Sequence, residues 1–324
     1  MKRRDLIILL GGAVLGWPRL ARTQQSAVPR VGYVGAGIRG TGRTGTAGLL
    51  RGLADLGYVF GRNLLLEERY ANGNPERVAP LINELLALNV NVLVTPGTPI
   101  TLAAHRATST VPIVCVTGDP VRTGLAESLA RPGGNITGLS LLSGDYSVKW
   151  LELLREVVPA ARRVAIVWNP DNPGTVNQSK LMREAAPGLG LELTALSTRP
   201  ADVEDSLAAL VTASFDGFVV TDDPLIEPLL ARLIALAAER RLPAIYAFGE
   251  AVKQGGLMAY SADFFKLWQR AAGYVDRILK GARPAELPIE QATEVTLNVN
   301  LKTAKTLGLA IPEALLARAD EVIE

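Results

Sequence analysis

Two short segments carry the side chains best suited to binding or chemistry. In the first, Asp222 and Asp223 follow the strand-like run Phe218–Val220 and precede Pro224. Adjacent carboxylates can pair with a ligand ammonium group, hold a metal ion or cap a helix that begins at the proline. No partner ligand for a metal is apparent, so we expect no metal here and keep two interpretations open, a ligand contact and a helix cap.

The second segment, Thr95-Pro-Gly-Thr98-Pro99, places two hydroxyl groups at the start of an expected helix. Proline is tolerated in the first helical turn because the amide hydrogen that it lacks would have no partner there. The free amides and the positive end of the helix dipole suit a ligand carboxylate. An ordinary capped turn explains the same residues, and both interpretations stay open.

The side chains that usually drive catalysis are scarce. His105 is the only histidine and lies in a helical pattern, which excludes a site of several imidazoles and favours an exposed helix surface. Cys115, the only cysteine, lies in the apolar run Ile113–Val116, without a neighbouring base or cation to activate its thiolate. We therefore expect a buried thiol, no disulfide within the chain, and a non-enzymatic protein that needs no cofactor.

A glycine-rich loop is the feature that suggests an enzyme. Gly35-Ala-Gly37-Ile-Arg-Gly40 follows a strand-like run and formally matches the fingerprint of dinucleotide-binding folds. Gly42, Gly45 and Gly48 weaken the expected helix, which we predict to begin near Thr44. The acidic residue that the fingerprint requires about 20 positions on is missing. A flexible loop over a ligand cleft is favoured, and an NAD-dependent oxidoreductase is the less favoured alternative.

The framework around these segments alternates between two periodicities. Short β-branched runs alternate with amphipathic helical stretches from Arg30 onward, as in βαβ units with a parallel sheet covered on both faces. The strands expected in the first half are Arg30–Val34, Asn63–Glu68, Val90–Thr95, Val111–Val116 and Asn135–Leu139. The second half is expected to contain strands at Arg163–Trp168, Leu191–Leu196, Asp216–Val220, Ala244–Tyr246 and Leu257–Tyr260, and helices over Asp202–Thr212, Pro224–Arg240 and Asp263–Lys280.

The length of 324 residues exceeds what one core usually holds, so we expect two lobes. Hydrophobic residues make up 48% and charged residues 20%, without a block of like charge, which indicates a globular body and no nucleic-acid partner. One stretch looks repeated, since Val92–Thr95 leads to Pro99 much as Phe218–Thr221 leads to Pro224. A true repeat would make these two loops face each other across a cleft at the carboxyl ends of both sheets.

The first 23 residues have the layout of an export signal. Lys2, Arg3 and Arg4 precede the apolar run Leu6–Trp17, and Ala21-Arg22-Thr23 follows. The run is too short for the roughly 20 apolar residues that cross a bilayer. Removing residues 1–23 would lower the formal charge from +2 to −2, and no cysteine follows for lipid attachment. We expect a periplasmic protein, and the arginine pair suggests the twin-arginine route.

Motifs along nearly the whole chain resemble the ABC-transporter substrate-binding proteins of the tryptophan/tyrosine-type group. The matching segments are Met1-Lys-Arg-Arg4, Leu10-Gly-Gly-Ala13, Val116-Thr-Gly-Asp-Pro120, Arg131-Pro-Gly-Gly-Asn-Ile-Thr-Gly138, Trp168-Asn-Pro-Asp-Asn-Pro173, Gly255-Gly-Leu-Met-Ala-Tyr260 and Leu301-Lys-Thr-Ala-Lys-Thr-Leu-Gly-Leu309. The resemblance implies the type I periplasmic-binding-protein fold and a small polar or amino-acid-like ligand. The sequence departs from the pattern at Ala259 and Ser261, where serine and glycine are commoner.

Together these features predict the solute-binding component of an ABC importer with an α/β fold, in which two doubly wound parallel-sheet lobes are joined by a multi-crossing hinge. We expect residues 28–140 with 262–289 to form the N-terminal lobe, and 141–261 with 290–324 the C-terminal lobe. The residues expected to line the cleft stand at strand ends: Gly37, Thr95, Thr98, Asp119, Asn169, Asp222 and Tyr246. Tyr246 is expected to offer a stacking face.

The expected mechanism is capture by closure. Hinge rotation near residues 139–142, 260–262 and 288–292 would bring the lobes together over the ligand. The expected partners are the small-molecule ligand and an ABC permease in the inner membrane, and we expect a monomer. The alternative is a periplasmic sensor that presents its closed form to a membrane receptor.

Overall fold

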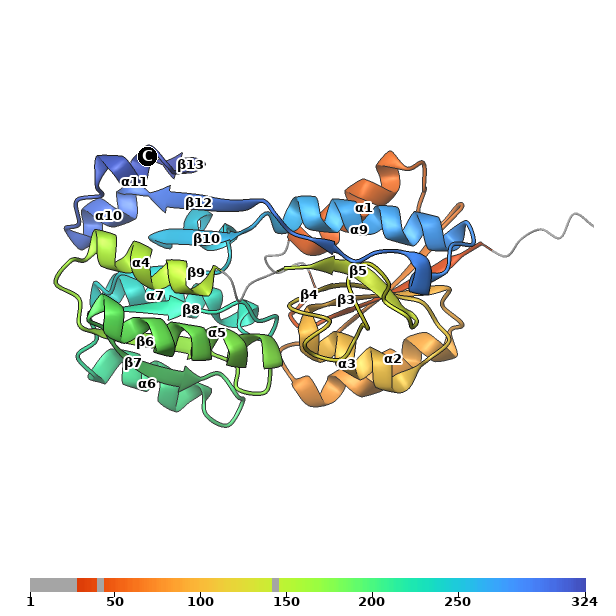
Figure 1. Cartoon of the computed structure of the whole chain (residues 1–324), viewed down its shortest axis with the longest axis horizontal. Coiled ribbons are helices and arrows are strands. Elements are labelled where there is room, and N and C mark those ends of the chain that lie inside the picture. Colours follow the sequence, from red (N-terminus) through yellow and green to blue (C-terminus); the bar gives the residue numbers. More distant parts are fainter. Residues whose placement is uncertain (1–27, 40–43, 142–145) are drawn as a thin grey trace, which may run out of the picture.

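The computed structural model describes residues 28–39, 44–141 and 146–324. Two α/β lobes lie side by side along the longest axis of the molecule (Figure 1). The predicted export signal, residues 1–23, falls outside the described residues. Within the described part of the chain, every helix is too short or too polar to span a bilayer.

The first lobe is built on a six-stranded sheet in the order β11-β5-β4-β3-β1-β2, and its strand pairs run parallel. Helices α2 and α3 cover one face and α1 and α9 the other (Figure 1), so apolar side chains form a core on each face. The strands are β1 (Arg30–Gly35), β2 (Leu65–Tyr70), β3 (Val92–Pro96), β4 (Ile113–Thr117), β5 (Ile136–Ser140) and β11 (Glu290–Gln291). The helices are α1 (Thr44–Asp55), α2 (Val78–Ala87), α3 (Gly97–Ala107) and α9 (Phe264–Leu279).

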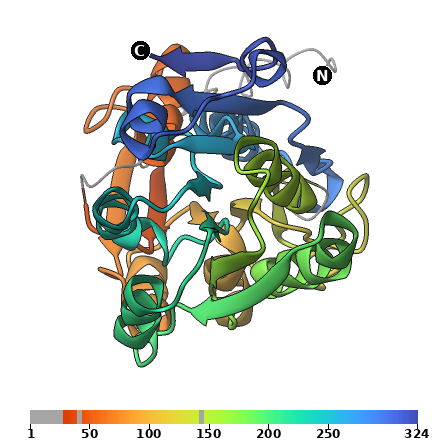
Figure 2. The ribbon, with the colours of Figure 1, turned by 90° about the vertical axis from the view of Figure 1, so that its left-hand side faces the viewer.

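The second lobe has a seven-stranded sheet in the order β13-β12-β10-β9-β8-β6-β7. Its strands pair in parallel except β10 and β12, which run antiparallel. The strands are β6 (Arg163–Trp168), β7 (Glu192–Ser197), β8 (Gly217–Val220), β9 (Ala244–Tyr246), β10 (Met258–Ala262), β12 (Val295–Asn300) and β13 (Glu321–Ile323). The helices are α4 (Ser147–Val157), α5 (Pro173–Ala185), α6 (Val203–Thr212), α7 (Leu230–Arg240), α8 (Glu250–Lys253), α10 (Leu301–Leu307) and α11 (Glu313–Leu316). Figure 2 shows the last three elements, α10, α11 and β13, together at one edge of this lobe.

The predicted α/β class and the predicted strands are confirmed, with strand bounds shifted by at most two residues. One predicted helix, Pro224–Arg240, is wrong at its start, because α7 begins only at Leu230. The carboxylate of Asp223 accepts the Leu225 amide and turns the chain, and a short 3-10 turn, η3 (Glu227–Leu229), comes next. Pro228 inside that turn has no amide hydrogen, which disfavours an uninterrupted α-helix through this segment.

The chain passes between the lobes three times. It crosses after β5, at Asp263 between β10 and α9, and again between β11 and β12 (Figure 1). The last crossing comes later than the expected boundary at Ile289, because Glu290 and Gln291 pair with β5 of the first lobe. The edge of β5 offers unpaired backbone groups, and the Ala292 amide also donates to the Ser140 carbonyl there. The two lobes are therefore connected by three segments of the chain, which together form the hinge.

Candidate ligand-binding site

The lobes touch through the loops that follow their central strands. A Cβ atom on Gly97, directly after β3, would lie 2.4 Å from Cγ of Pro224, which follows β8. A Cβ atom on Gly118, after β4, would lie 3.9 Å from Cα of Gly174 at the start of α5. The two loops of the apparent repeat therefore face each other across the gap, as the sequence predicts.

Two further contacts extend this meeting of the lobes. Arg122 Nη1 donates to Asn177 Oδ1 at 3.2 Å, from the first lobe to the second. Gly37 is buried in the loop after β1, and a Cβ atom there would lie 3.6 Å from the Glu227 carboxylate and 3.7 Å from Pro228. A side chain at position 37 would thus enter the space between the lobes.

The threonine hydroxyls at the start of α3 are bonded within the first lobe. Thr95 Oγ1 lies 3.0 Å from Thr101 Oγ1, and Thr98 Oγ1 lies 2.9 Å from Thr117 Oγ1, all four residues being buried. Thr98 also stands close to the second lobe, since a Cβ atom on Gly174 would lie 3.7 Å from its hydroxyl oxygen. These hydroxyls fix the loop shape at the contact between the lobes.

Asp223 ties together the loops that follow β6 and β8. Its Oδ2 accepts from Nδ2 of Asn169 at 3.0 Å and of Asn172 at 2.7 Å, and its Oδ1 accepts the Leu225 amide at 2.7 Å. Asp223, Asn169 and Asn172 are all buried. The aspartate thus caps the turn before α7, which is close to the capping role expected of it.

Asp222, the other member of the aspartate pair, is half-buried and lies near the start of α4. Burial, and after it the negative charge of Asp222, raise the pKa of the Tyr146 phenol well above its ordinary value. The Tyr146 ring packs edge-on against Tyr260 of β10, with centroids 6.0 Å apart. Asp222 therefore acts on an aromatic group that borders the hinge.

Two further predicted site residues, Asp119 and Tyr246, make contacts within their own lobes. Asp119 is 48% exposed at its side chain, and its Oδ1 accepts the amides of Val121 and Arg122 at 3.1 and 2.9 Å, so that it caps a turn. Tyr246 is fully buried, with its ring edge-on to Phe218 at 6.2 Å. The ring belongs to the second-lobe core, which corrects the expectation of a stacking face. A three-residue strand at the centre of a sheet buries its side chains on both faces.

Cys115 and His105 are the residues whose side chains most often take part in catalysis, and both lie where the sequence predicts. Cys115 is buried, as predicted, and burial raises the pKa of its thiol to about 12. His105 is exposed on α3, also as predicted. Among the described residues, no group of three or more histidine, cysteine, aspartate or glutamate side chains is arranged to hold a metal ion.

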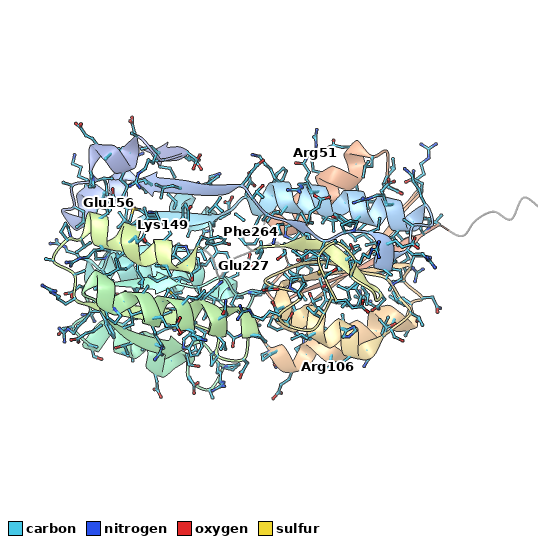
Figure 3. The ribbon with its side chains drawn as sticks, in the orientation of Figure 1. Arg51, Arg106, Lys149, Glu156, Glu227 and Phe264 are labelled. Atoms are coloured by element: carbon cyan, nitrogen blue, oxygen red, sulfur yellow. The ribbon has the colours of Figure 1, made fainter. Side chains whose placement is uncertain are left out.

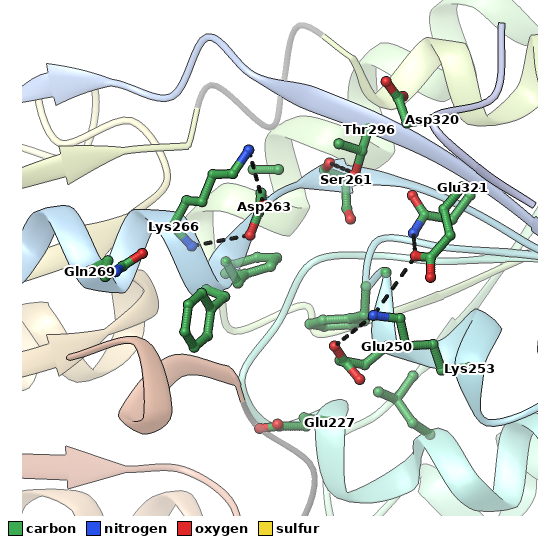
Figure 4. Close-up of a pocket in the computed structure, with 17 residues that line it drawn as sticks. Glu227, Glu250, Lys253, Ser261, Asp263, Lys266, Gln269, Thr296, Asp320 and Glu321 are labelled. Carbon is green, nitrogen blue, oxygen red and sulfur yellow. Dashed lines mark hydrogen bonds and ion pairs between the residues drawn. The ribbon is translucent and has the colours of Figure 1, made fainter. Parts of the chain in front are cut away.

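A cavity of about 710 Å³ lies between the lobes beside the hinge (Figure 4). Its size falls within the range of small-molecule sites in proteins. The walls come from the start of α9 in the first lobe and from η3, α8, β10, β12 and β13 in the second. The lining residues are Glu227, Leu230, Phe248, Gly249, Glu250, Lys253, Ser261, Ala262, Asp263, Phe264, Phe265, Lys266, Gln269, Thr296, Asn298, Asp320 and Glu321.

Aromatic rings form one wall of this cavity. Phe248, after β9, and Phe264, at the start of α9, are stacked with centroids 6.2 Å apart and planes 25° apart, and Phe265 stands beside them. Phe264 packs against the cores of both lobes, and Figure 3 shows Phe264 and Glu227 where the lobes meet. The helix begins there because the Asp263 carboxylate accepts the Lys266 amide as an N-cap.

The rest of the cavity wall is charged and polar. Five carboxylates and two lysines line it, so the net charge is negative. Lys253 lies 3.9 Å from Glu250 and 3.8 Å from Glu321, and Lys266 lies 3.6 Å from Asp263. A small molecule with a ring and a cationic group matches this combination of walls.

None of the seven residues expected at strand ends is among those that line the cavity. A Cβ atom on Gly37 would lie 3.6 Å from the carboxylate of Glu227, which is a lining residue. Two signals could have indicated the lining residues. Ser261, Thr296 and Asn298 are polar residues within strand patterns, and the pair Phe264-Phe265 directly follows the second crossing. Their meeting depends on β12 returning beside β10, which a strand pattern does not specify.

Comparison with known proteins gives a consistent result. The family model described as "ABC transporter substrate binding protein" matches residues 40–323. A tyrosine-binding protein of Clostridioides difficile (strain R20291) is 27% identical over 266 residues, which cover 81% of this chain and 76% of that protein.

Two solved structures are similar over 91% of this chain and 99% of their own. A conserved domain protein from Vibrio cholerae O1 biovar El Tor is 30% identical, with a TM-score of 0.83. An ABC domain from Streptococcus pneumonia, solved in complex with L-Trp, is 22% identical, with a TM-score of 0.82. At 22% identity, the similarity to the Streptococcus structure establishes the fold alone.

Proposed function

The chain belongs to the ABC transporter substrate-binding protein family, and from that premise we propose that it captures an aromatic amino acid in the cavity between its lobes. It is the extracytoplasmic substrate-binding component of an ABC transporter. The family is non-enzymatic, so the alternative of an NAD-dependent oxidoreductase is wrong. The tyrosine named for one relative and the L-Trp bound by another support an aromatic ligand.

The observation that carries the proposal is the composition of the cavity wall. Stacked Phe248 and Phe264 offer an apolar surface against which a ligand ring can pack, and carboxylates on β13, α8 and η3 offer partners for an ammonium group. An aromatic amino acid carries both groups. Lys253 and Lys266 supply positive charge for its carboxylate.

The strand-end residues enter the proposal either as ligand contacts or as supports of the surrounding structure. Gly37 and Asp222 are proposed to approach the ligand, since Gly37 abuts Glu227 and Asp222 acts on Tyr146 beside the hinge. Thr95, Thr98 and Asn169 are proposed to hold the loops in shape through their hydrogen bonds. Asp119 is proposed to support Arg122, which reaches the second lobe, and Tyr246 to support the wall from within the core.

We propose that capture proceeds by closure about the three-stranded hinge. The ligand would enter between open lobes, bind one of them and be covered by the other. Ligand shifts the balance between open and closed forms only as far as the closed form binds it better. The contacts of Gly97 with Pro224 and of Arg122 with Asn177 are those expected of a closed form.

The proposal extends to the partner of the protein and to its location in the cell. We propose a monomer in the periplasm that delivers its ligand to an ABC permease in the inner membrane. Export by the twin-arginine route is testable through Arg3→Lys with Arg4→Lys, which should leave the protein in the cytoplasm on fractionation. Normal export of that double variant would reject the route.

Calorimetric titration of the purified mature chain tests the ligand. L-tyrosine, L-tryptophan and L-phenylalanine should bind, while L-leucine and L-glutamate should bind at least about tenfold more weakly, because they lack a ring to pack on the phenylalanine wall. Small-angle scattering of the same samples should show a more compact particle with ligand. Binding of none of the three aromatic amino acids would reject the proposal.

A further inference from the structure

Two residues of β10 and β12 that line the cavity each have a buried polar side-chain atom without a hydrogen-bond partner among the described residues. The atoms are Oγ of Ser261 on β10 and Oδ1 of Asn298 on β12. Ser261 is 1% exposed and Asn298 is 8% exposed. Leaving such atoms unsatisfied is costly, so native proteins rarely retain buried polar atoms without a partner.

The orientation of the Asn298 amide follows from its neighbour. Its Nδ2 donates to Oε2 of Glu321 at 2.8 Å. A carboxylate can only accept, so the NH₂ group must point toward Glu321 and the carbonyl oxygen away from it. Oδ1 is thus the atom of this side chain left without a partner, and an amide oxygen acts only as an acceptor.

The two residues share one face of the sheet. In the antiparallel pair β10–β12, Ser261 stands opposite Thr296 and Ala259 opposite Asn298, so Ser261 and Asn298 are diagonal neighbours.

Gly249 keeps the space beside these atoms open. A Cβ atom there would lie 3.7 Å from both Ser261 Oγ and Asn298 Nδ2. The backbone of Gly249, with φ −57° and ψ −34°, suits any residue, so its conformation does not require glycine. The missing side chain leaves room for a ligand group next to the hydroxyl.

We propose that Ser261 and Asn298 form the subsite that holds the ammonium group of the amino-acid ligand. The ammonium donates to Asn298 Oδ1 and to a lone pair of Ser261 Oγ, and it needs acceptors only. Carboxylates outnumber lysines in the cavity wall, which favours a cation over a neutral group. This assignment rests on the proposed function, and it places the recognition of the ligand on two strands that adjoin crossings between the lobes.

The test compares amino acids with their deaminated analogues. Wild-type protein should bind L-tyrosine at least about tenfold more tightly than 3-(4-hydroxyphenyl)propionate, and L-phenylalanine likewise over 3-phenylpropionate. Ser261→Ala and Gly249→Ala should weaken both amino acids about tenfold and the deaminated acids much less. The matched controls are Ser214→Ala, at an exposed serine, and Gly273→Ala, on α9 with no described atom within 4 Å of the new Cβ.

The outcomes separate the subsite from the function. If wild type binds L-tyrosine and both variants bind it equally well, the subsite is wrong and the proposed function stands. If Ser261→Ala weakens L-tyrosine but not L-phenylalanine, the subsite holds the phenol hydroxyl, and the ammonium assignment is overturned. If wild type binds no aromatic amino acid, both proposals fail. Circular dichroism and thermal unfolding of each variant should match wild type, because neither substitution creates a steric overlap.

Discussion

Gly97 and Pro224 meet across the gap between the lobes so closely that a Cβ atom on Gly97 would lie 2.4 Å from Cγ of the proline. Gly97 also has φ +70°, in the left-handed region that favours glycine. Each residue follows a central strand of its own lobe. The contact exists only while the lobes are together, so it reports on closure.

Replacing Gly97 with alanine should weaken ligand binding at least about tenfold, because the methyl group overlaps the proline ring and disfavours the closed form. The substitution also strains the backbone by about 1–2 kcal/mol, which lowers the stability of the open and closed forms alike and therefore leaves the affinity unchanged. Gly124→Ala is the matched control, since Gly124 has φ +74° and no described atom lies within 4 Å of the new Cβ. Calorimetry measures affinity and scattering measures compaction; equal affinities in the two variants would refute the closure argument.

Asp223→Asn should lower the free energy of unfolding by about 2–3 kcal/mol. The new amide would turn a donor toward the amides of Asn169 and Asn172, which now donate to a buried carboxylate. Urea unfolding measures the loss. Asp171→Asn is the control, because Asp171 is exposed and its ion pair with Arg199 is screened by solvent. A loss no larger than that of the control would show that the buried network adds little.

Cys115 should resist thiol reagents in the native protein and react fully in concentrated urea, since the side chain is buried. A slow native reaction with the same rate as global unfolding agrees with this. Rapid native labelling would contradict the buried position.

The burial of the Cys115 thiol should also make the free energy of unfolding depend on pH. Burial raises the Cys115 pKa from 9.0 to about 12, so the folded state keeps the proton where the unfolded state releases it. The contribution is intact below pH 9 and is lost as the pH rises from 9 to 12. Between pH 9 and 10, wild type should lose about 1 kcal/mol more than Cys115→Ala in urea unfolding. Parallel curves would reject the shift.

Phe248→Leu should weaken aromatic amino acids by about three- to tenfold, because the leucine fills similar space but cannot stack with a ring. The Phe264 partner is left in place, so the fold should persist. Phe60→Leu, at an exposed phenylalanine outside the cavity, should change nothing. Titration of L-tryptophan against all three proteins gives the comparison, and unaltered affinity in Phe248→Leu would remove the aromatic wall from the site.

The fold was predictable because its signals are local. The run Arg163–Trp168 is a strand with the expected bounds, because positions 164–168 are apolar and positions 164–167 are buried, as in a parallel sheet covered on both faces. The start of α7 was not predictable to the same degree. Besides the local bond to Leu225, the Asp223 carboxylate that caps the turn is held by Asn169 and Asn172, about 50 positions earlier in the chain.

The site residues, like the elements of the fold, were predictable only where the signal in the sequence is local. Gly37 and Thr98 could be placed at the meeting of the lobes from strand ends alone, because ligands of open α/β sheets bind beyond the carboxyl ends of strands. Tyr246 stands at an equally good strand end but points into the core, and sequence pattern does not separate the two cases. Which way a strand-end ring points depends on the packing of the neighbouring elements.

By itself, the amino-acid sequence determined the α/β class, the two lobes, the scarcity of catalytic side chains and the resemblance to substrate-binding proteins, because these follow from local periodicity, composition and short motifs. Only the tertiary structure decided that Phe248, Ser261, Phe264 and Asn298 share one cavity. These residues come from segments separated along the chain, and they meet because β12 returns antiparallel to β10 while α9 crosses into the other lobe. Long-range pairing of that kind is set by the packing of whole elements, and no local stretch of sequence encodes it.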